Sequence, residues 1–202
     1  MRNSECKVAA IVLAAGISQR MGIPKMTLPW MGSTVLGTVV SAVHEAGVGH
    51  IRVVTGGSRE LVEQIIEELS FPVEVDFNPG YANGEMLDSI KVGLSNLGSN
   101  INTVLIALGD QPQIEVKVIS AVVMRYCETH STLIVPSHQI RRGHPWLIEK
   151  SLWGEILGMA SGLTMRDFFA KHSAEIDYLS VNTPSGLQDL DTPGDYKKAL
   201  EK

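Results

Sequence analysis

The sequence is poor in cysteine and carries no excess of positive charge. It holds 2 cysteines, Cys6 and Cys127, in 202 residues. Because they are far apart and form no CxxC pair, they argue against a disulfide framework or a zinc site and suit a reducing compartment. The formal net charge is -5, which gives no reason to expect attraction to nucleic acid or to an anionic membrane. Any anionic ligand must therefore be held by local cations and backbone amides.

Long apolar runs are also lacking. No segment approaches the length of a membrane span, and the N-terminus has no long apolar stretch followed by a cleavage site. We therefore expect a cytoplasmic protein without a membrane or nucleic acid as partner. Hydrophobic residues make up 44% of the chain, which is enough for a core. Because no repeat, linker or low-complexity run interrupts the sequence, residues 1–202 are expected to form a single domain.

Up to residue 137, strand-like and helix-like segments alternate. Strands are predicted over 7–14, 50–57, 73–77, 102–110 and 131–137, and helices over 34–47, 58–70, 86–98 and 115–130. Beyond them the patterns predict a loop feeding a strand over 138–148, a short helix over 162–172, a strand over 174–181 and a closing helix over 192–202. This alternation predicts an α/β fold with helices flanking a mostly parallel sheet.

Polar residues and glycines follow the predicted strands at 14, 55, 77 and 108. In open α/β sheets, ligands bind beyond the carboxyl ends of the strands. These four strand ends therefore mark the expected position of a site.

The first of these strand ends leads into a loop with glycines and cations, within the segment AAIVLAAGISQRMGIPKMTLPW at 9–30. Gly16 and Gly22 permit turns that direct backbone N–H groups at an anion. Arg20 and Lys25 supply donors for phosphate oxygens. The spacing matches neither a Walker P-loop nor G-x-G-x-x-G. The residues alone leave two interpretations open, a polyphosphate site and a glycine turn with solvated cations.

Carboxylates appear in two further segments, LIALGDQP and GLQDLDTPGDY. Asp110 directly follows a buried strand, and Asp189, Asp191 and Asp195 lie near the end of the chain. Oxygen ligands of this kind suit Mg²⁺, which takes only one or two protein carboxylates together with phosphates and water. The alternative for Asp110 and Asp191 is the capping of a turn or helix.

The segment LAAGISQRMGIPKMTLPW resembles the signature L-A-A-G-x-S-x-R-M-G-x-x-K-x-x-L-P-W of the nucleotidyltransferases, and most of all that of the molybdenum cofactor cytidylyltransferases. The resemblance implies a three-layer sandwich with a Rossmann-like sheet, of the nucleotide-diphospho-sugar transferase type. It implies that the loop contacts the nucleotide through the residues Leu13, Ala14, Ala15 and Gly16. Arg20 and Lys25 would bind the triphosphate. The pair Ala14-Ala15 stands where the guanylyltransferases usually carry Gly-Gly, which favours CTP.

Further motifs extend this resemblance. G-D-Q-P and D-[IL]-D-T-P-x-D-[YF] imply that Asp110 and Asp191 coordinate a catalytic Mg²⁺, while Asp189 and Asp195 support the loop and the start of the last helix. With Lys25 and Arg20, which would stabilise the α-phosphate and the departing pyrophosphate, these two carboxylates form the predicted catalytic set.

The segment NPGYANGEMLDSIKVGL at 78–94 resembles N-P-x-Y-A-x-G-[LM]-x-x-S-[LIV]. It implies nucleotide contacts for Asn78, Gly84 and Ser89. Asn78 suits a base or ribose as a directional partner, although Asn-Pro-Gly is also an ordinary turn signal. Glu85-Met86 departs from the pattern, which has Met or Leu directly after the glycine, and this leaves open which residue contacts the base.

The segment IRRGHPWLI resembles R-G-H-P-x-x-[FIV] near the molybdopterin site. It implies that Arg142, Gly143 and His144 bind the acceptor, so that the C-terminal part serves the acceptor and the N-terminal part the nucleotide. The alternative for His144 is packing against Trp146. The apolar spacing of LTMRDFFAKH predicts core and lid rather than chemistry.

The reaction implied by the resemblance is transfer of CMP from CTP to molybdenum-molybdopterin, with Mg²⁺ as cofactor and pyrophosphate as the second product. Transient contact with a molybdenum hydroxylase or its chaperone is a further expectation. Two alternatives stay open: another nucleotidyltransferase, of the sugar-phosphate or isoprenoid type, and a non-catalytic carrier of the molybdenum cofactor. No nucleophile–histidine pattern indicates a covalent intermediate.

Overall fold

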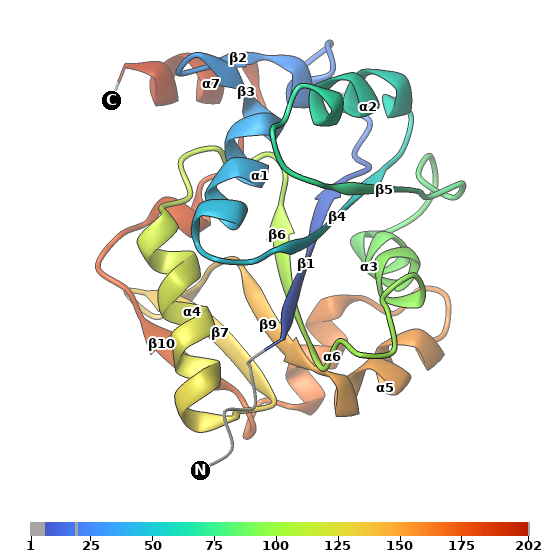
Figure 1. Ribbon diagram of the computed structural model, residues 1–202, viewed down its shortest axis with the longest axis vertical. Helices are drawn as coiled ribbons and strands as arrows, with labels where there is room; N and C mark the ends of the chain where they lie inside the picture. The colour runs from blue at the N-terminus through green and yellow to red at the C-terminus, as the bar shows by residue number, and fades with distance from the viewer. Residues whose placement is uncertain (1–6, 19, 202) are drawn as a thin grey trace.

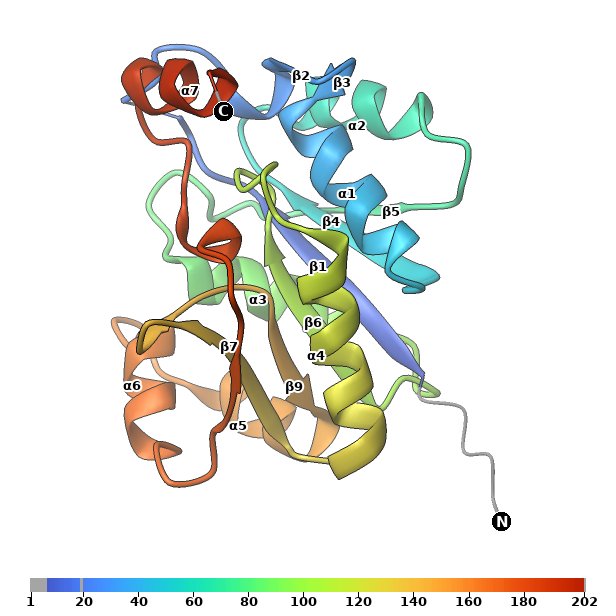
Figure 2. The ribbon, with the colours of Figure 1, turned by 90° about the vertical axis from the view of Figure 1, so that its left-hand side faces the viewer.

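The computed structural model describes residues 7–18 and 20–201. These residues form one eight-stranded sheet with helices packed on both of its faces (Figures 1 and 2). The strands of this sheet are β1 (Val8–Ala14), β4 (His50–Thr55), β5 (Glu74–Phe77), β6 (Thr103–Leu108), β7 (Leu133–His138), β8 (Arg141–Arg142), β9 (Trp146–Glu149) and β10 (Asp177–Ser180). A separate hairpin consists of β2 (Pro29–Trp30) and β3 (Ser33–Thr34).

The helices are α1 (Val35–Glu45), α2 (Arg59–Glu67), α3 (Met86–Ser95), α4 (Val116–Thr129), α5 (Trp153–Gly158), α6 (Met165–Lys171) and α7 (Pro193–Leu200). Three short 3-10 helices are η1 (Lys25–Thr27), η2 (Lys150–Leu152) and η3 (Ser185–Leu187).

The strand order is β10-β7-β9-β6-β1-β4-β5, with β8 paired to β7. The run β6-β1-β4-β5 is parallel throughout, and β10 is parallel to β7. Strand β9 is antiparallel to both of its neighbours, β6 and β7. The predicted α/β fold with a mostly parallel sheet is therefore confirmed, and the position and direction of β9 are new.

Two apolar layers hold the helices against the sheet, and β1 shows how they arise. All seven of its residues are buried, so the strand is a continuous apolar run, as expected of a strand covered on both faces. Ala10 and Val12 belong to the core layer under α1, α2 and α4. Ile11 and Leu13 belong to the layer under α3, α5 and α6. This alternation is the period of two of a β-strand.

The C-terminal segment returns across the molecule to the N-terminal hairpin. Beyond β10 it passes through η3 and ends in α7, which lies beside β2 and β3 (Figure 2). A third apolar cluster joins Trp30, Leu190 and Tyr196, and the Tyr196 hydroxyl donates to the Pro29 carbonyl at 2.5 Å. The start of α7 is capped by Thr192 and Asp195, so the alternative that made Asp191 the helix cap is wrong.

Cysteine usage differs from the expectation. Cys127, on α4, is disulfide-bonded, although the separation of the two cysteines in the sequence argued against a disulfide framework. Cys6 lies outside the described residues.

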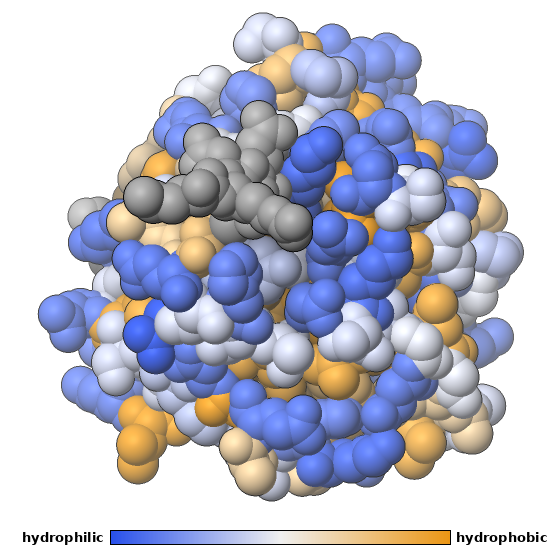
Figure 3. Space-filling view, turned by 60° about the horizontal axis from the view of Figure 1, so that its bottom comes forward, coloured by the Kyte–Doolittle hydropathy of each residue, from blue (hydrophilic) through white to orange (hydrophobic). Residues whose placement is uncertain are grey.

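The surface shows no large apolar band on the face seen in Figure 3, where hydrophobic residues are scattered among hydrophilic ones. In the described part of the chain, no helix has the length and apolarity that a membrane crossing requires.

Candidate active site

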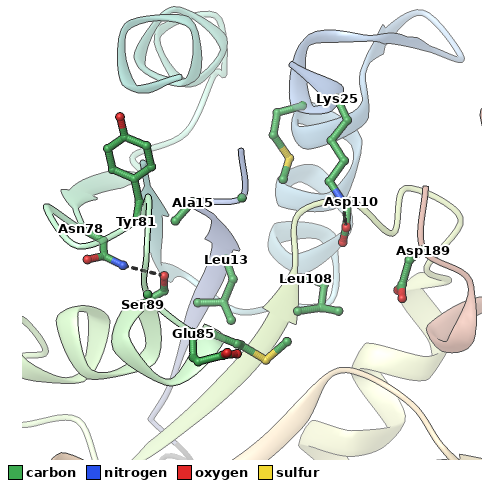
Figure 4. A pocket seen from close by; sticks show the side chains of 14 residues that line it. Leu13, Ala15, Lys25, Asn78, Tyr81, Glu85, Ser89, Leu108, Asp110 and Asp189 are labelled. Atoms are coloured by element: carbon green, nitrogen blue, oxygen red, sulfur yellow. Dashed lines mark hydrogen bonds and ion pairs between the residues drawn. The ribbon is translucent and has the colours of Figure 1, made fainter. Parts of the chain in front are cut away.

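A pocket lies at the carboxyl ends of β1 and β6, beside the loop between β5 and α3 (Figure 4). Strands β4 and β5 continue the sheet on one side of β1, and β6 lies on the other, so the pocket occupies a topological switch point, where ligands of open α/β sheets bind. The lining residues are Leu13, Ala15, Gly16, Lys25, Met26, Asn78, Tyr81, Gly84, Glu85, Met86, Ser89, Leu108, Asp110 and Asp189.

Most residues predicted to bind the nucleotide line this pocket. They are Leu13, Ala15, Gly16, Lys25, Asn78, Gly84 and Ser89. Two others lie outside the lining set. Ala14 directs its side chain into the core layer under α1, so its backbone is the part left for a ligand. Arg20 is exposed and faces Asp191 instead.

The predicted cations and carboxylates form one cluster. The Lys25 Nζ donates to Asp110 Oδ2 and lies 3.4 Å from Asp191 Oδ1. The Arg20 Nη2 donates to the other oxygen of Asp191 at 2.9 Å. Only 11% of the Lys25 side chain and 15% of the Asp110 side chain are exposed. The central ion pair is therefore shielded from water, whereas Arg20 stands at the surface with 72% exposure.

Local hydrogen bonds position Lys25. The Ser18 Oγ accepts from the Lys25 backbone N–H at 3.1 Å, and the Ser18 carbonyl accepts from the N–H groups of Met21 and Gly22. Ser18 and Gly22 have φ values of 51° and 74°, a left-handed conformation that glycine adopts without cost. Gly22 therefore serves the turn. The anchoring role of Ser18 was not predicted.

Two further backbone bonds position Asp110. The Gly109 N–H donates to the Leu13 carbonyl at 2.9 Å, and the Leu190 N–H donates to the Asp110 carbonyl at 3.3 Å. The first of these bonds prolongs the pairing of β1 with β6. The second fastens the C-terminal segment, with Asp189 and Asp191 on either side of Leu190, to the end of β6.

Asp189 was predicted only to support its loop, but it lines the pocket as a third carboxylate. The Gln111 Nε2 donates to it at 2.6 Å, and Gln111 is buried. Burial raises the pKa of Asp189, and the charges of Asp110 and Asp191 raise it further, against the opposing effects of Gln111 and Lys25. The polar residue Gln111, directly after Asp110, was the available signal for this contact.

The carboxylate oxygens of Asp110 and Asp191 lie close enough together to share one cation. Asp110 and Asp191 converge on a single ammonium group, and two hard oxygen donors around one cation are what Mg²⁺ takes from a protein when phosphates and water complete its shell. Among residues 7–18 and 20–201, no group of three or more His, Cys, Asp or Glu side chains is arranged to hold a metal ion. The donor set therefore suits a metal shared with a ligand rather than one held by the protein alone.

Asn78 uses its side chain for the loop itself. Its Oδ1 accepts from the Gly80 N–H at 2.9 Å, and its Nδ2 donates to the Ser89 Oγ at 3.0 Å (Figure 4). The turn interpretation of Asn78 is thus what the geometry shows, while direct contact with a base stays a prediction. At Gly84 a Cβ would lie 2.8 Å from the Gly80 carbonyl oxygen, so the same tight loop requires this glycine.

Sequence reasoning missed the wall formed by Tyr81. This residue lines the pocket, and its ring packs against Gly56 and Gly57 at the end of β4, where added Cβ atoms would lie within 3.0 Å of the tyrosine. The glycine pair directly after a predicted strand was the signal that could have indicated a close approach.

The predicted acceptor residues lie apart from the lining of this pocket, on the segment from β8 to β9. Arg142 stacks its guanidinium over the rings of Phe169 and Tyr178, at 5.9 and 5.5 Å from their centroids. The Gly143 N–H donates to the Pro136 carbonyl at 2.8 Å. Trp146, the first residue of β9, pairs with Ile106 of β6. The segment therefore leads into β9 near the carboxyl end of β6.

His144 packs against Trp146, with ring centroids 4.2 Å apart, as the alternative interpretation expected. Burial lowers the pKa of His144 to about 3, so its imidazole is neutral at ordinary pH. Its Nε2 is buried without a hydrogen-bond partner in the described part of the chain. Phe168 and Phe169 of α6 are buried in the core, as their spacing predicted.

Fold and site together define a class of enzyme, the nucleotidyltransferases, in which a loop after the first strand and a carboxylate after a neighbouring strand meet at a switch point. The MobA-like NTP transferase domain matches residues 10–176, and the chain belongs to this family.

Similar curated proteins and solved structures with the same fold are known. The chain is 28% identical over 202 residues to the molybdenum cofactor cytidylyltransferase of Escherichia coli K12, covering 96% of each chain. It is 31% identical over 134 residues to the bifunctional protein GlmU of Geotalea uraniireducens, covering 63% of this chain and 28% of that protein. Rv0371c from Mycobacterium tuberculosis superposes with a TM-score of 0.83 at 24% identity, covering 97% of this chain and 99% of that one. A CMP:2-keto-3-deoxy-manno-octonic acid synthetase in complex with CTP superposes with a TM-score of 0.79 at 13% identity, covering 96% of this chain and 97% of that one.

Proposed function

We propose that this protein transfers CMP from CTP to the terminal phosphate of molybdenum-molybdopterin and releases pyrophosphate. The observation that carries the proposal is the convergence of Lys25, Asp110 and Asp191 beside a pocket at the end of β1. The likeness to a molybdenum cofactor cytidylyltransferase along nearly the whole chain supports the choice of CTP and of the acceptor.

The pocket suits a nucleoside triphosphate lying against the backbone. Gly16 has open space in the direction of a side chain, so a ligand can approach its peptide closely. Lys25 and Asp110 lie at one end of the pocket, and Asn78, Tyr81 and Ser89 at the other (Figure 4). The phosphates of CTP would lie at the first end and the base at the second.

Transfer requires positioning and charge neutralisation more than covalent chemistry. An oxygen of the acceptor phosphate forms a bond to the α-phosphorus of CTP as the bond to the bridging oxygen of pyrophosphate breaks. Lys25 would stabilise charge on the α-phosphate, and Arg20 would stabilise the departing pyrophosphate. No general base is needed, because a phosphate monoester is ionised near neutral pH.

Asp110 and Asp191 would hold the cofactor, Mg²⁺, through their oxygens. When bound, the ion supplies neutralisation of the triphosphate charge and a template for the two phosphates. Asp189, held by Gln111, adds negative charge to the same pocket wall, which favours a cation there.

The acceptor would lie toward β8 and β9, where Arg142, Gly143 and His144 are found. The exposed guanidinium of Arg142 supplies donors for an anionic group. The neutral His144 would contribute a hydrogen bond through its buried Nε2, which lacks a partner in the described part of the chain. Transient delivery of the product to a molybdenum hydroxylase or its chaperone remains part of this proposal.

A second candidate is nucleotidyl transfer to a sugar phosphate. The nucleotide half of the site would serve either acceptor.

Pyrophosphate release, measured with each of the four NTPs with and without molybdenum-molybdopterin, tests the proposal. Release with CTP alone among the nucleotides, and only in the presence of that acceptor, is the expected result. Release that needs a sugar phosphate would favour the second candidate. Lys25→Ala and Asp110→Ala should each abolish turnover, and full activity in either folded variant would refute the mechanism.

A further inference from the structure

The residues predicted to bind the triphosphate are paired with the residues predicted to bind the metal. Lys25 contacts both Asp110 and Asp191, so its ammonium group stands between the two carboxylates that a divalent cation would bridge. A positive charge in that position repels a second cation, and this repulsion is strong where water is excluded.

We propose that Lys25 competes with a divalent cation for Asp110 and Asp191, and that a bound polyphosphate relieves this competition by drawing the ammonium group away. Free metal then binds the protein weakly, and metal and nucleotide enter the site together. The proposal takes the assignment of these carboxylates as metal ligands from the proposed function, and it adds the role of Lys25 as their internal counter-ion.

The burial of Lys25 explains why only an anion would displace it. Its side chain is 11% exposed. Separating a shielded ammonium group from its carboxylate partners costs free energy unless another negative group replaces them. The backbone of Lys25 is fixed by the bond from its N–H to the Ser18 Oγ, so only the side chain is left to move. Because Lys25 lines the pocket, the phosphates of a ligand there are within its range.

Arg20 provides an internal comparison. It contacts only Asp191 and is 72% exposed, so water replaces its partner at little cost and the side chain moves aside freely. The two cations of the cluster therefore differ in kind. Lys25 is the shielded competitor for the metal position, and Arg20 is a solvated neighbour.

Direct titration with Mn²⁺, in the absence of any nucleotide, tests this role. Binding of Mn²⁺ to the whole protein is measured by electron paramagnetic resonance and by calorimetry. Lys25→Met should bind Mn²⁺ at least about tenfold more tightly than the unaltered protein, because one positive charge has been removed from between the two carboxylates. Arg20→Met should produce a smaller gain.

Three further variants test whether the effect arises at this site. Lys117→Met removes another ion-paired lysine, which is 74% exposed on α4, and it should leave Mn²⁺ binding unchanged. Combining Lys25→Met with Asp110→Asn should abolish the gain, since the metal then loses a ligand. Lys25→Gln serves as a second variant of the same position, and its thermal midpoint with and without Mn²⁺ reports on folding and binding together.

Equal or weaker Mn²⁺ binding in the folded Lys25→Met and Lys25→Gln variants would overturn the proposal. A gain that survives Asp110→Asn would also overturn it, because the metal would then lie elsewhere. The measurement involves neither CTP nor an acceptor. A tenfold gain in a protein that fails to release pyrophosphate from CTP would therefore refute the proposed function and leave the role of Lys25 intact.

Discussion

Gly56, at the end of β4, is the position where the smallest substitution should disturb both the fold and the pocket. An added Cβ would lie 2.5 Å from the Ala15 carbonyl oxygen and 2.7 Å from the Tyr81 Cβ. Neither atom is the free end of a flexible side chain, so the backbone of one of the two loops must move. Both loops border the pocket, and therefore the strain falls on the proposed nucleotide site.

We expect Gly56→Ala to lower the free energy of unfolding by about 1–3 kcal/mol, the usual cost of overpacking. For a chain of this size, that corresponds to a fall of about 2–12 °C in the melting temperature. Urea unfolding and calorimetry measure the two quantities. Affinity for CTP, measured by calorimetry, should also fall in the folded variant, because Ala15 and Tyr81 line the pocket.

Two glycine-to-alanine controls separate strain from the substitution itself. In Gly57→Ala, the added Cβ would lie 2.8 Å from the Tyr81 Cε2 and would contact only the tyrosine side chain. A side chain moves aside more easily than a backbone, so this variant should lose less stability. Gly154→Ala, inside α5, has nothing within 4 Å and should stabilise by up to about 1 kcal/mol through helix propensity. If Gly56→Ala matches the unaltered protein in both stability and CTP affinity, the close approach of these loops does not govern the pocket.

Three further predictions concern Asp189, His144 and Tyr196. Burial raises the pKa of Asp189 above 3.8, so the ionised carboxylate lowers the stability of the protein once the pH rises through its pKa in the folded state. Asp189→Asn should therefore raise the melting temperature at pH 7, and the difference should vanish below pH 3.8. The pKa of His144 is lowered from 6.5 to about 3, so its NMR signals should show no titration above pH 5, and a titration midpoint near pH 6.5 would refute its burial. The free energy of unfolding should fall as the pH drops from 6.5 toward 3, because over this range only the imidazole of the unfolded chain is protonated. Tyr196→Phe removes the bond to the Pro29 carbonyl and should cost about 0.5–1.5 kcal/mol in urea unfolding; an unchanged midpoint would show that this bond adds nothing.

The parallel half of the fold was predictable because its signals are local. Strands such as β1, buried on both faces, are short apolar runs, and β1 is soon followed by Gly16. The helices between the strands carry clear start signals such as Thr34 before α1. Strand β9 has four residues and no local feature that sets its direction. Its antiparallel place between β6 and β7 depends on pairing with strands distant in sequence, which no window of the sequence contains.

The hairpin of β2 and β3 was missed for a related reason. Its turn carries Met31 and Gly32 at φ values of 42° and 85°, and methionine is an unusual residue for a left-handed turn position. Helix α5 has six residues, too few for a helical period to show clearly.

The clustered charges and most of the pocket lining were predicted, and the contacts made by Tyr81 and Gln111 were not. Lys25 and Asp110 stand in motifs that mark them in the sequence, and the structure brings them together across β1 and β6. Tyr81 and Gln111 stand in the quoted motifs as well, but no role was predicted for either, because their importance lies in what they touch: the glycines after β4 in one case and Asp189 in the other. Contacts of this kind follow from the tertiary packing alone.

The C-terminal segment explains how residues at opposite ends of the chain form one site. Asp189 and Asp191 are placed by the bond from the Leu190 N–H to Asp110 and by the burial of the Leu190 side chain beside Trp30. The hairpin that carries Trp30 directly follows the loop that carries Lys25. The same apolar cluster therefore positions both the carboxylates and the lysine between them, and loosening it would separate the charges of the site without changing any of them.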